Sequence, residues 1–225
     1  MLRFRQIFEI WRWDNSLTQA LTASYTMLER TDRMYRLSSS ALRENDNGDI
    51  CANIFEEDRT INQFHQEVRR KVLRHLAVAG GANLVPGLVL SCIVGDIERI
   101  GDYTKNISEL AVAHNAPLSC GFCEQEVSKM EKAVEDIFSR IVQALKTSDQ
   151  AEARSLIVDN MWIRKSCDDI MLNLINGRDN TISSGSSVVL ALYVRYLKRI
   201  TEHLMNILSS VVNPYESIGY RDDIV

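Results

Sequence analysis

Residues that interrupt regular structure are scarce in this sequence, with three prolines and ten glycines among 225 residues. Hydrophobic residues make up 45% of the chain and charged residues 25%. Disordered chains are typically poor in hydrophobic residues and rich in proline and glycine, so this balance predicts a folded protein with a sizeable core. A chain of this length can form one large domain or two small ones, which makes an internal repeat worth seeking.

The sequence also lacks a long hydrophobic run. Its longest apolar stretch, residues 84–94, is interrupted by Pro86 and Gly87 and falls far short of the roughly 20 residues that span a membrane. The first residues do not show an apolar segment followed by a small-residue cleavage site. We therefore expect a cytoplasmic protein that does not cross the membrane.

Positive charge is not in excess, because the formal net charge is -4. Such a chain has no broad cationic field for a phosphate backbone, which argues against nucleic acid as a partner. Cysteine occurs five times, an odd number, and mostly within helical patterns. This usage does not resemble a secreted disulfide framework and favours a reducing compartment.

Catalytic motifs are missing as well. The chain contains neither a nucleophile elbow nor a phosphate-cradling Gly-Lys-Ser loop, so we do not expect an enzyme. Cys120 and Cys123 form a Cys-x-x-Cys sequence just before a helix, where the helix N-terminus could lower a thiol pKa. Thiol redox chemistry or zinc binding at this pair is therefore kept as an alternative, although no strand pattern and no second Cys-x-x-Cys accompany it.

Helical patterns fill most of the chain. The clearest one has apolar residues at steps of three and four, the spacing of one helical face: Val127, Met130, Val134, Ile137, Ile141 and Leu145. Other helices are expected over residues 14–41, 49–76, 86–114, 149–176 and 186–212, with no competing strand pattern. The fold class predicted is all-α, with six long helices.

The third and sixth helices repeat each other at a shift of one hundred residues. The first has an apolar face that the second matches position by position: Ile97, Ile100, Thr104, Ile107 and Ala111 against Leu197, Ile200, Leu204, Ile207 and Val211. The polar positions match too, with Arg99, Asp102 and Asn106 answering to Arg199, Glu202 and Asn206. The second and fifth helices match at a shift of 102, for example Ile61 with Ile163. These matches predict two antiparallel three-helix bundles in tandem, residues 1–117 and 118–225.

An acidic stripe follows the third helix. Glu98, Asp102, Asn106 and Glu109 fall on one side of it, opposite the apolar face. Two like charges four residues apart mildly destabilise a helix, and a bound cation would reverse this effect. Carboxylates one turn apart offer oxygen ligands to iron, manganese, magnesium or zinc.

The segment from Asp96 to Ile107, which reads Asp-Ile-Glu-Arg-Ile-Gly-Asp-Tyr-Thr-Lys-Asn-Ile, resembles the signature of the PhoU family of phosphate-uptake regulators. That family is itself a tandem of three-helix units, and the likeness covers roughly residues 16–212. The resemblance implies a cytoplasmic regulator that restrains phosphate uptake and damps a sensor kinase. It further implies a homodimer that binds phosphate transporter components and the sensor kinase, and that meets the membrane only through these partners.

The resemblance also implies metal ions on the acidic stripes. By position, Glu98 and Asp102 are the expected ligands of the first unit, with Asp58 and Asn62 on the second helix opposite them. Asn62 departs from the pattern, because a neutral amide is a poorer ligand than a carboxylate.

The second unit departs further from the family pattern. Lys198 stands where an acid belongs, and Asn160 and Arg164 replace the acids of the second helix. We expect its stripe to be held by the charges of Lys198 and Arg164 beside Glu202, with Glu202 and His203 as weaker candidate ligands. A helical adaptor for an ion transporter that lacks the metal is a further alternative.

Overall fold

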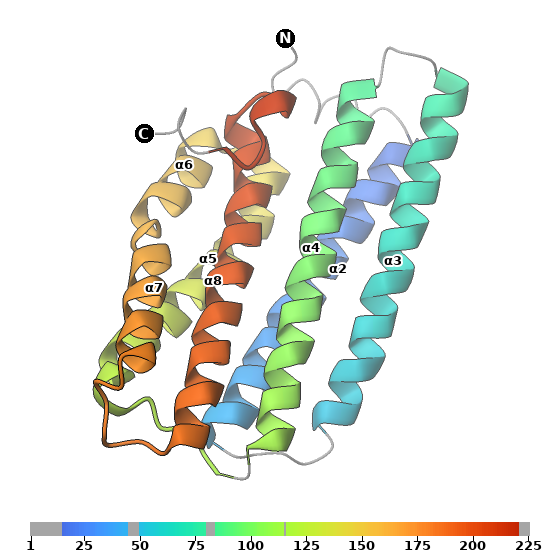
Figure 1. The fold of residues 1–225 in the computed structure, drawn as a ribbon. Helices are drawn as coiled ribbons and strands as arrows, with labels where there is room; N and C mark the ends of the chain where they lie inside the picture. Colours follow the sequence, from blue (N-terminus) through green and yellow to red (C-terminus); the bar gives the residue numbers. More distant parts are fainter. Residues whose placement is uncertain (1–14, 45–49, 80–83, 115, 221–225) are drawn as a thin grey trace.

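The structure is a computed structural model that describes residues 15–44, 50–79, 84–114 and 116–220. These ranges contain only helices and connecting segments, and no strand. The helices, shown in Figure 1, are α2 (Asn15–Glu44), α3 (Ile50–Ala79), α4 (Leu84–Ala113), α5 (Glu124–Thr147), α6 (Gln150–Asp159), α7 (Trp162–Ile175) and α8 (Ser184–Val212), with short 3₁₀ turns η2 (Gly121–Cys123) and η3 (Tyr215–Ser217).

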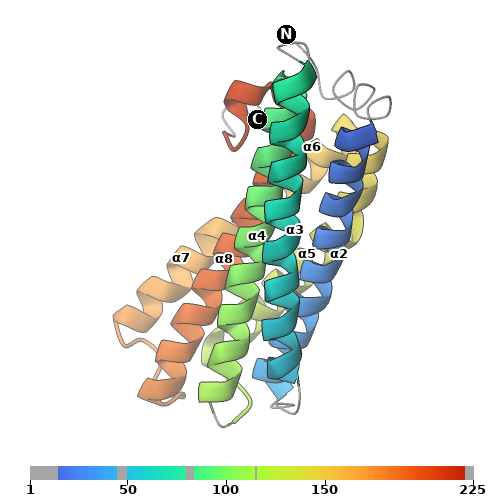
Figure 2. The same cartoon turned by 90° about the vertical axis from the view of Figure 1, so that its right-hand side faces the viewer.

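The helices form two bundles side by side. Helices α2, α3 and α4 pack together, and α8 packs against α5, α6 and α7. The bundles meet where α4 lies along α8, and the two helices run in opposite directions (Figure 1). Figure 2 shows the first bundle from the side of α3, with α8 and α7 behind α4. The predicted all-α tandem of three-helix bundles is confirmed.

The faces that revealed the repeat form the core. All ten apolar-face positions of α4 and α8 are at most 1% exposed, Thr104 included. Ile61 and Ile163, paired at the shift of 102, are both fully buried. Thr104 satisfies its hydroxyl within the helix by donating to the carbonyl of Ile100, 2.8 Å away. Burial of these matched faces is the main reason why two similar sequences adopt two similar bundles.

Local sequence sets the ends of the helices in the second bundle. Asp149 caps α6 by accepting from the backbone amides of Ala151 and Glu152, both 3.0 Å away. Ser183 caps α8 in the same way, through the amide of Ser186 at 3.1 Å. Five of the six predicted helices agree with the structure within a few residues, and the predicted first residues of two of them, 14 and 49, lie outside the described ranges.

One predicted helix was wrong in its continuity. Residues 149–176 form two helices, α6 and α7, because the chain leaves the helical conformation at Asn160, where φ is -113° and ψ is 6°. The Asn160 amide donates to the carbonyl of Leu156 at 2.9 Å and so takes the place of a backbone donor. Asparagine competes readily for backbone hydrogen bonds in this way, and the periodicity of the apolar residues continues across the break.

No helix in the described ranges is long and apolar enough to cross a membrane.

Candidate functional site

The predicted ligands of the first repeat lie on two neighbouring helices. Glu98 and Asp102 are on α4, whereas Asp58 and Asn62 are on α3. The amide of Asn62 donates to Asp58 Oδ2 at 3.3 Å, so these two side chains already satisfy each other in part. Asp58 is 7% exposed, and among the residues that the structure describes it is the only buried acid.

A lysine that the sequence analysis did not single out lies between the two helices. Lys105 on α4 places its Nζ atom 3.0 Å from Asp58 Oδ2 and 3.7 Å from Asp102 Oδ1. Burial lowers the pKa of Lys105, but the hydrogen bond to Asp58 and the negative charges of Asp58, Asp102 and Glu109 outweigh burial and shift this pKa upward. The ammonium therefore stays charged and neutralises the acids from within the protein.

Glu98 has a different environment. Its Oε2 atom lies 3.6 Å from Arg99 Nε, and the same guanidinium reaches Asp102 Oδ2 at 3.3 Å. Burial raises the pKa of Glu98, and the negative charge of Asp102 raises it further. Positive and negative side chains thus alternate along the stripe, and Lys105 and Arg99 form ion pairs with its acids.

This arrangement does not fit a bound metal ion. The ammonium of Lys105 takes the position between Asp58 and Asp102 that a cation would need. Among the described residues, no three side chains of histidine, cysteine, aspartate or glutamate come together so that they could hold a metal. Metal binding by Glu98, Asp102, Asp58 and Asn62 stays a prediction, and it requires Lys105 to move away.

The second repeat also uses side-chain cations. Lys198, whose side chain is 9% exposed, lies 2.5 Å from Asp168 Oδ1 on α7. Glu202 receives Arg199 Nη1 at 2.5 Å and has Arg164 Nε at 4.0 Å. Glu202 is therefore held by ion pairs as expected, but its close partner is Arg199. Lys198 instead pairs with Asp168, an acid that the sequence did not single out.

His203 faces the first repeat and not Glu202. Its Nδ1 atom donates to Asp96 Oδ1 at 2.7 Å, and Asn206 Nδ2 donates to the same oxygen at 3.2 Å. The residue is 8% exposed, and its Nε2 atom has no hydrogen-bond partner within the described ranges. His203 and Glu202, both weaker candidate ligands, thus point to different neighbours.

Aromatic rings also lie in the seam between α4 and α8. Tyr103 lies 6.0 Å from Tyr196 and 5.8 Å from His203, measured between ring centroids. Arg199 lies over the Tyr103 ring at 5.7 Å and donates to its hydroxyl at 3.2 Å. The two repeats therefore meet through a specific polar and aromatic contact in addition to apolar packing.

The alternative site at Cys120 and Cys123 is buried. These residues are 0% and 2% exposed, and burial raises the pKa of the Cys120 thiol to about 12 and that of the Cys123 thiol to about 11. Arg43 Nη1 lies 3.0 Å from the sulfur of Cys120 and only partly offsets this effect. A thiol with a raised pKa is a poor nucleophile and a poor metal ligand, so the geometry disfavours both uses.

The sequence and the fold are both similar to those of known proteins. The model of the PhoU domain matches residues 25–111 and, a second time, residues 127–211. Among solved structures, PhoU from Pseudomonas aeruginosa is 20% identical, with a TM-score of 0.78 and coverage of 87% of this chain and 95% of that one. The phosphate transport system regulatory protein PhoU from Streptococcus pneumoniae is 16% identical, with a TM-score of 0.75 and coverage of 86% and 92%. No curated protein matches the chain.

Proposed function

Because the chain belongs to the PhoU family, we propose that it regulates phosphate uptake and phosphate-dependent signalling by binding protein partners in the cytoplasm. The single observation behind this proposal is the match to two PhoU domains, residues 25–111 and 127–211, which together make up most of the chain. Its partners under this proposal are components of a phosphate transporter and a sensor kinase. A regulator of this kind acts by occupying a surface and needs no catalytic group.

Exposed apolar side chains on the second bundle support a contact surface. Leu172 and Ile175 at the end of α7 are 57% and 76% exposed, and Val188 at the start of α8 is 60% exposed. Apolar side chains that gather at the surface often mark places where another protein binds. We propose that this end of the second bundle contacts the phosphate transporter.

Uptake measurements test the regulatory proposal. In cells that lack this protein, we expect fast phosphate uptake in phosphate-rich medium, which the wild-type chain restores to a low rate. The double variant Ile175→Asp with Val188→Asp should fail to restore the low uptake rate, because it places charges on two side chains that the partner would bury. Val78→Asp is the matched control, since Val78 is 89% exposed on α3 in the other bundle. Unchanged uptake with and without the wild-type chain would contradict the function itself.

A specific observation favours a second candidate, a helical adaptor for an ion transporter that works without metal. Lys105 and Lys198 both place an ammonium between helices beside acids. We propose that these internal ammonium groups do in this chain what metal ions do in a metal-binding relative, namely hold neighbouring helices together. Metal analysis of protein purified without chelator separates this adaptor from a metal-dependent regulator.

A further inference from the structure

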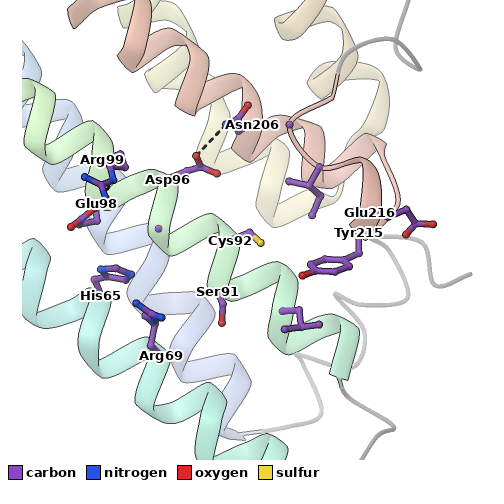
Figure 3. Close-up of a pocket in the computed structure, with 14 residues that line it drawn as sticks. His65, Arg69, Ser91, Cys92, Asp96, Glu98, Arg99, Asn206, Tyr215 and Glu216 are labelled. Carbon is purple, nitrogen blue, oxygen red and sulfur yellow. Dashed lines mark hydrogen bonds and ion pairs between the residues drawn. The ribbon is translucent and has the colours of Figure 1, made fainter.

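A groove of about 880 Å³ opens between α3, α4 and the segment that follows α8 (Figure 3). Figure 3 shows His65 and Arg69 reaching from α3 toward α4, with Tyr215 and Glu216 on the opposite side. Ser91 on α4 adds a hydroxyl to the wall between them. A volume of this size suits an organic molecule better than a small ion.

Three cationic or titratable nitrogen side chains meet at one end of the groove. His65 and Arg69 lie one turn apart on α3, and Arg99 approaches from α4. Arg69 forms no ion pair with any residue in the described part of the chain. His65 likewise has no hydrogen-bond partner there, so two of the three groups are available to a ligand.

The charges at this end act on one another. Burial lowers the pKa of His65, and the positive charges of Arg69 and Arg99 lower it further. Two guanidinium groups near one imidazole create a positive potential that an anion would relieve. This end of the groove is therefore suited to a negatively charged group.

Acids line other parts of the groove and limit where an anion can lie. Asp96 is already engaged by His203 and Asn206, at 2.7 Å and 3.2 Å. Glu98 lies 3.6 Å from Arg99. Repulsion from these carboxylates confines an anion to the α3 wall, beside His65 and Arg69.

The opposite side of the groove carries an aromatic ring beside an acid. Tyr215 and Glu216 lie there, with the ring of Tyr215 facing α4 (Figure 3), and Leu88 and Ile218 also line the groove. Hydrogen bonds fix this segment: Asn213 Nδ2 donates to the carbonyls of residues 217 and 220, at 2.9 Å and 2.8 Å. A flat ring can stack on such a tyrosine while its charged end reaches the cations.

We propose that this groove binds a phosphate monoester that carries a flat ring, the chemistry of a nucleotide. The phosphate lies against His65 and Arg69, where the guanidinium fork of Arg69 donates to its oxygens, and the ring lies against Tyr215. This inference is independent of the regulatory function proposed above, because it concerns binding by the purified chain alone.

Calorimetric titration of the full chain with AMP, adenosine and inorganic phosphate tests the proposal. We expect AMP to bind more tightly than inorganic phosphate, and adenosine to bind much more weakly than AMP. Arg69→Gln should weaken AMP and phosphate binding about tenfold each, the effect of losing one charged hydrogen-bond donor. Arg70→Gln is the matched control, because Arg70 is the next residue on α3, is also exposed and does not line this groove.

A second variant tests the ring end. Tyr215→Leu keeps an apolar side chain in the contact with the core but removes the aromatic ring. We expect it to weaken AMP binding and to leave phosphate binding unchanged. Absence of AMP binding at millimolar concentration would overturn the proposal, as would equal affinities for adenosine and AMP. Wild-type affinity in Arg69→Gln would overturn the anion end, and wild-type affinity in Tyr215→Leu the ring end.

Discussion

Asp96 on α4 accepts a hydrogen bond from His203 on α8, with 2.7 Å between Oδ1 and Nδ1, and this contact joins the two repeats. When the two repeats are aligned at the shift of one hundred residues, Asp96 corresponds to Tyr196 and Tyr103 corresponds to His203. Tyr196 and Tyr103 are themselves in contact, with ring centroids 6.0 Å apart. The interface between the bundles thus has an internal two-fold relation in which one half is a hydrogen bond between polar side chains and the other a contact between aromatic rings.

Asp96→Ala should loosen this interface. It leaves His203 with no partner at Nδ1, in addition to the unpartnered Nε2, and removes the acceptor of Asn206. We expect the free energy of unfolding to fall by about 2 to 3 kcal/mol, measured by urea denaturation. Asp96→Asn keeps an oxygen acceptor and should lose less. A loss no larger than that of Glu216→Ala, an exposed site in the same groove, would show that the contact contributes little.

Lys105→Met tests whether an ammonium replaces a metal. Without Lys105, the Asp58 carboxylate, at 7% exposure, keeps the Asn62 amide as its one side-chain hydrogen-bond donor among the described residues. We expect unfolding to become easier by about 2 kcal/mol in metal-free buffer, because an acid is left without its counter-charge. Adding Asp58→Leu to Lys105→Met should recover part of this loss, since the two residues act as a pair.

The same variant should gain affinity for metal. With the ammonium absent, Asp58 and Asp102 lose the cation that lies between them, and their oxygens, together with those of Glu98, can bind manganese or zinc in competition with Arg99. We expect dialysis followed by elemental analysis to find more metal on Lys105→Met than on the wild type. Lys71→Met serves as a control, because Lys71 on α3 pairs with Glu67 and not with these acids. Stoichiometric metal on the wild type would contradict the replacement.

Much of the fold could be predicted because burial follows simple periodicities. Ile97 and Leu197 repeat in type and position, and the structure buries both completely. The break at Asn160 could not be predicted in the same way, since the apolar spacing runs through it and the deciding hydrogen bond to Leu156 is made by one polar side chain. A side-chain donor that competes with the backbone for one carbonyl does not change the periodicity of the apolar residues.

The candidate site was predictable only in part. The spacing placed Glu98 and Asp102 on one stripe, but it could not show that Lys105 would reach across to Asp58 on another helix, because that depends on how α3 and α4 pack. A signal did exist, since Lys105 follows Asp102 by three residues, the spacing of neighbours on a helix. The partner of Lys198, Asp168, lies within the predicted helix of residues 149–176, but whether its side chain meets Lys198 depends on how α7 packs against α8, which the spacing could not show.

Glu98→Gln should make stability less sensitive to pH. Because burial and Asp102 raise the pKa of Glu98 above its ordinary value of 4.5, the folded state keeps this proton to higher pH than the unfolded chain does. The proton therefore favours folding at low pH, and this contribution is lost as the pH rises through the raised pKa. We expect Glu98→Gln to unfold at higher urea than the wild type at pH 7, with the gain fading below pH 4.5.

Glu109→Gln is the matched control for that experiment, because Glu109 lies on the same stripe of α4 and is exposed. Glu109→Gln should leave unchanged the difference in urea stability between pH 7 and a pH below 4.5. A destabilised Glu98→Gln protein at pH 7 would mean that the contact with Arg99, 3.6 Å away, outweighs the effect of burial.

Cys120 and Cys123 should react slowly with thiol reagents in the native protein. With thiol pKa values of about 12 and about 11, only a small fraction of either is ionised at pH 8, and the thiolate is the reactive form. Labelling followed by peptide mass spectrometry should find both at least about 100-fold slower than in urea, with rates that rise about tenfold between pH 8 and pH 9. Selective, fast labelling of this pair at pH 8 would revive the thiol alternative, because it would require an accessible and ionised sulfur that burial beside Arg43 does not provide.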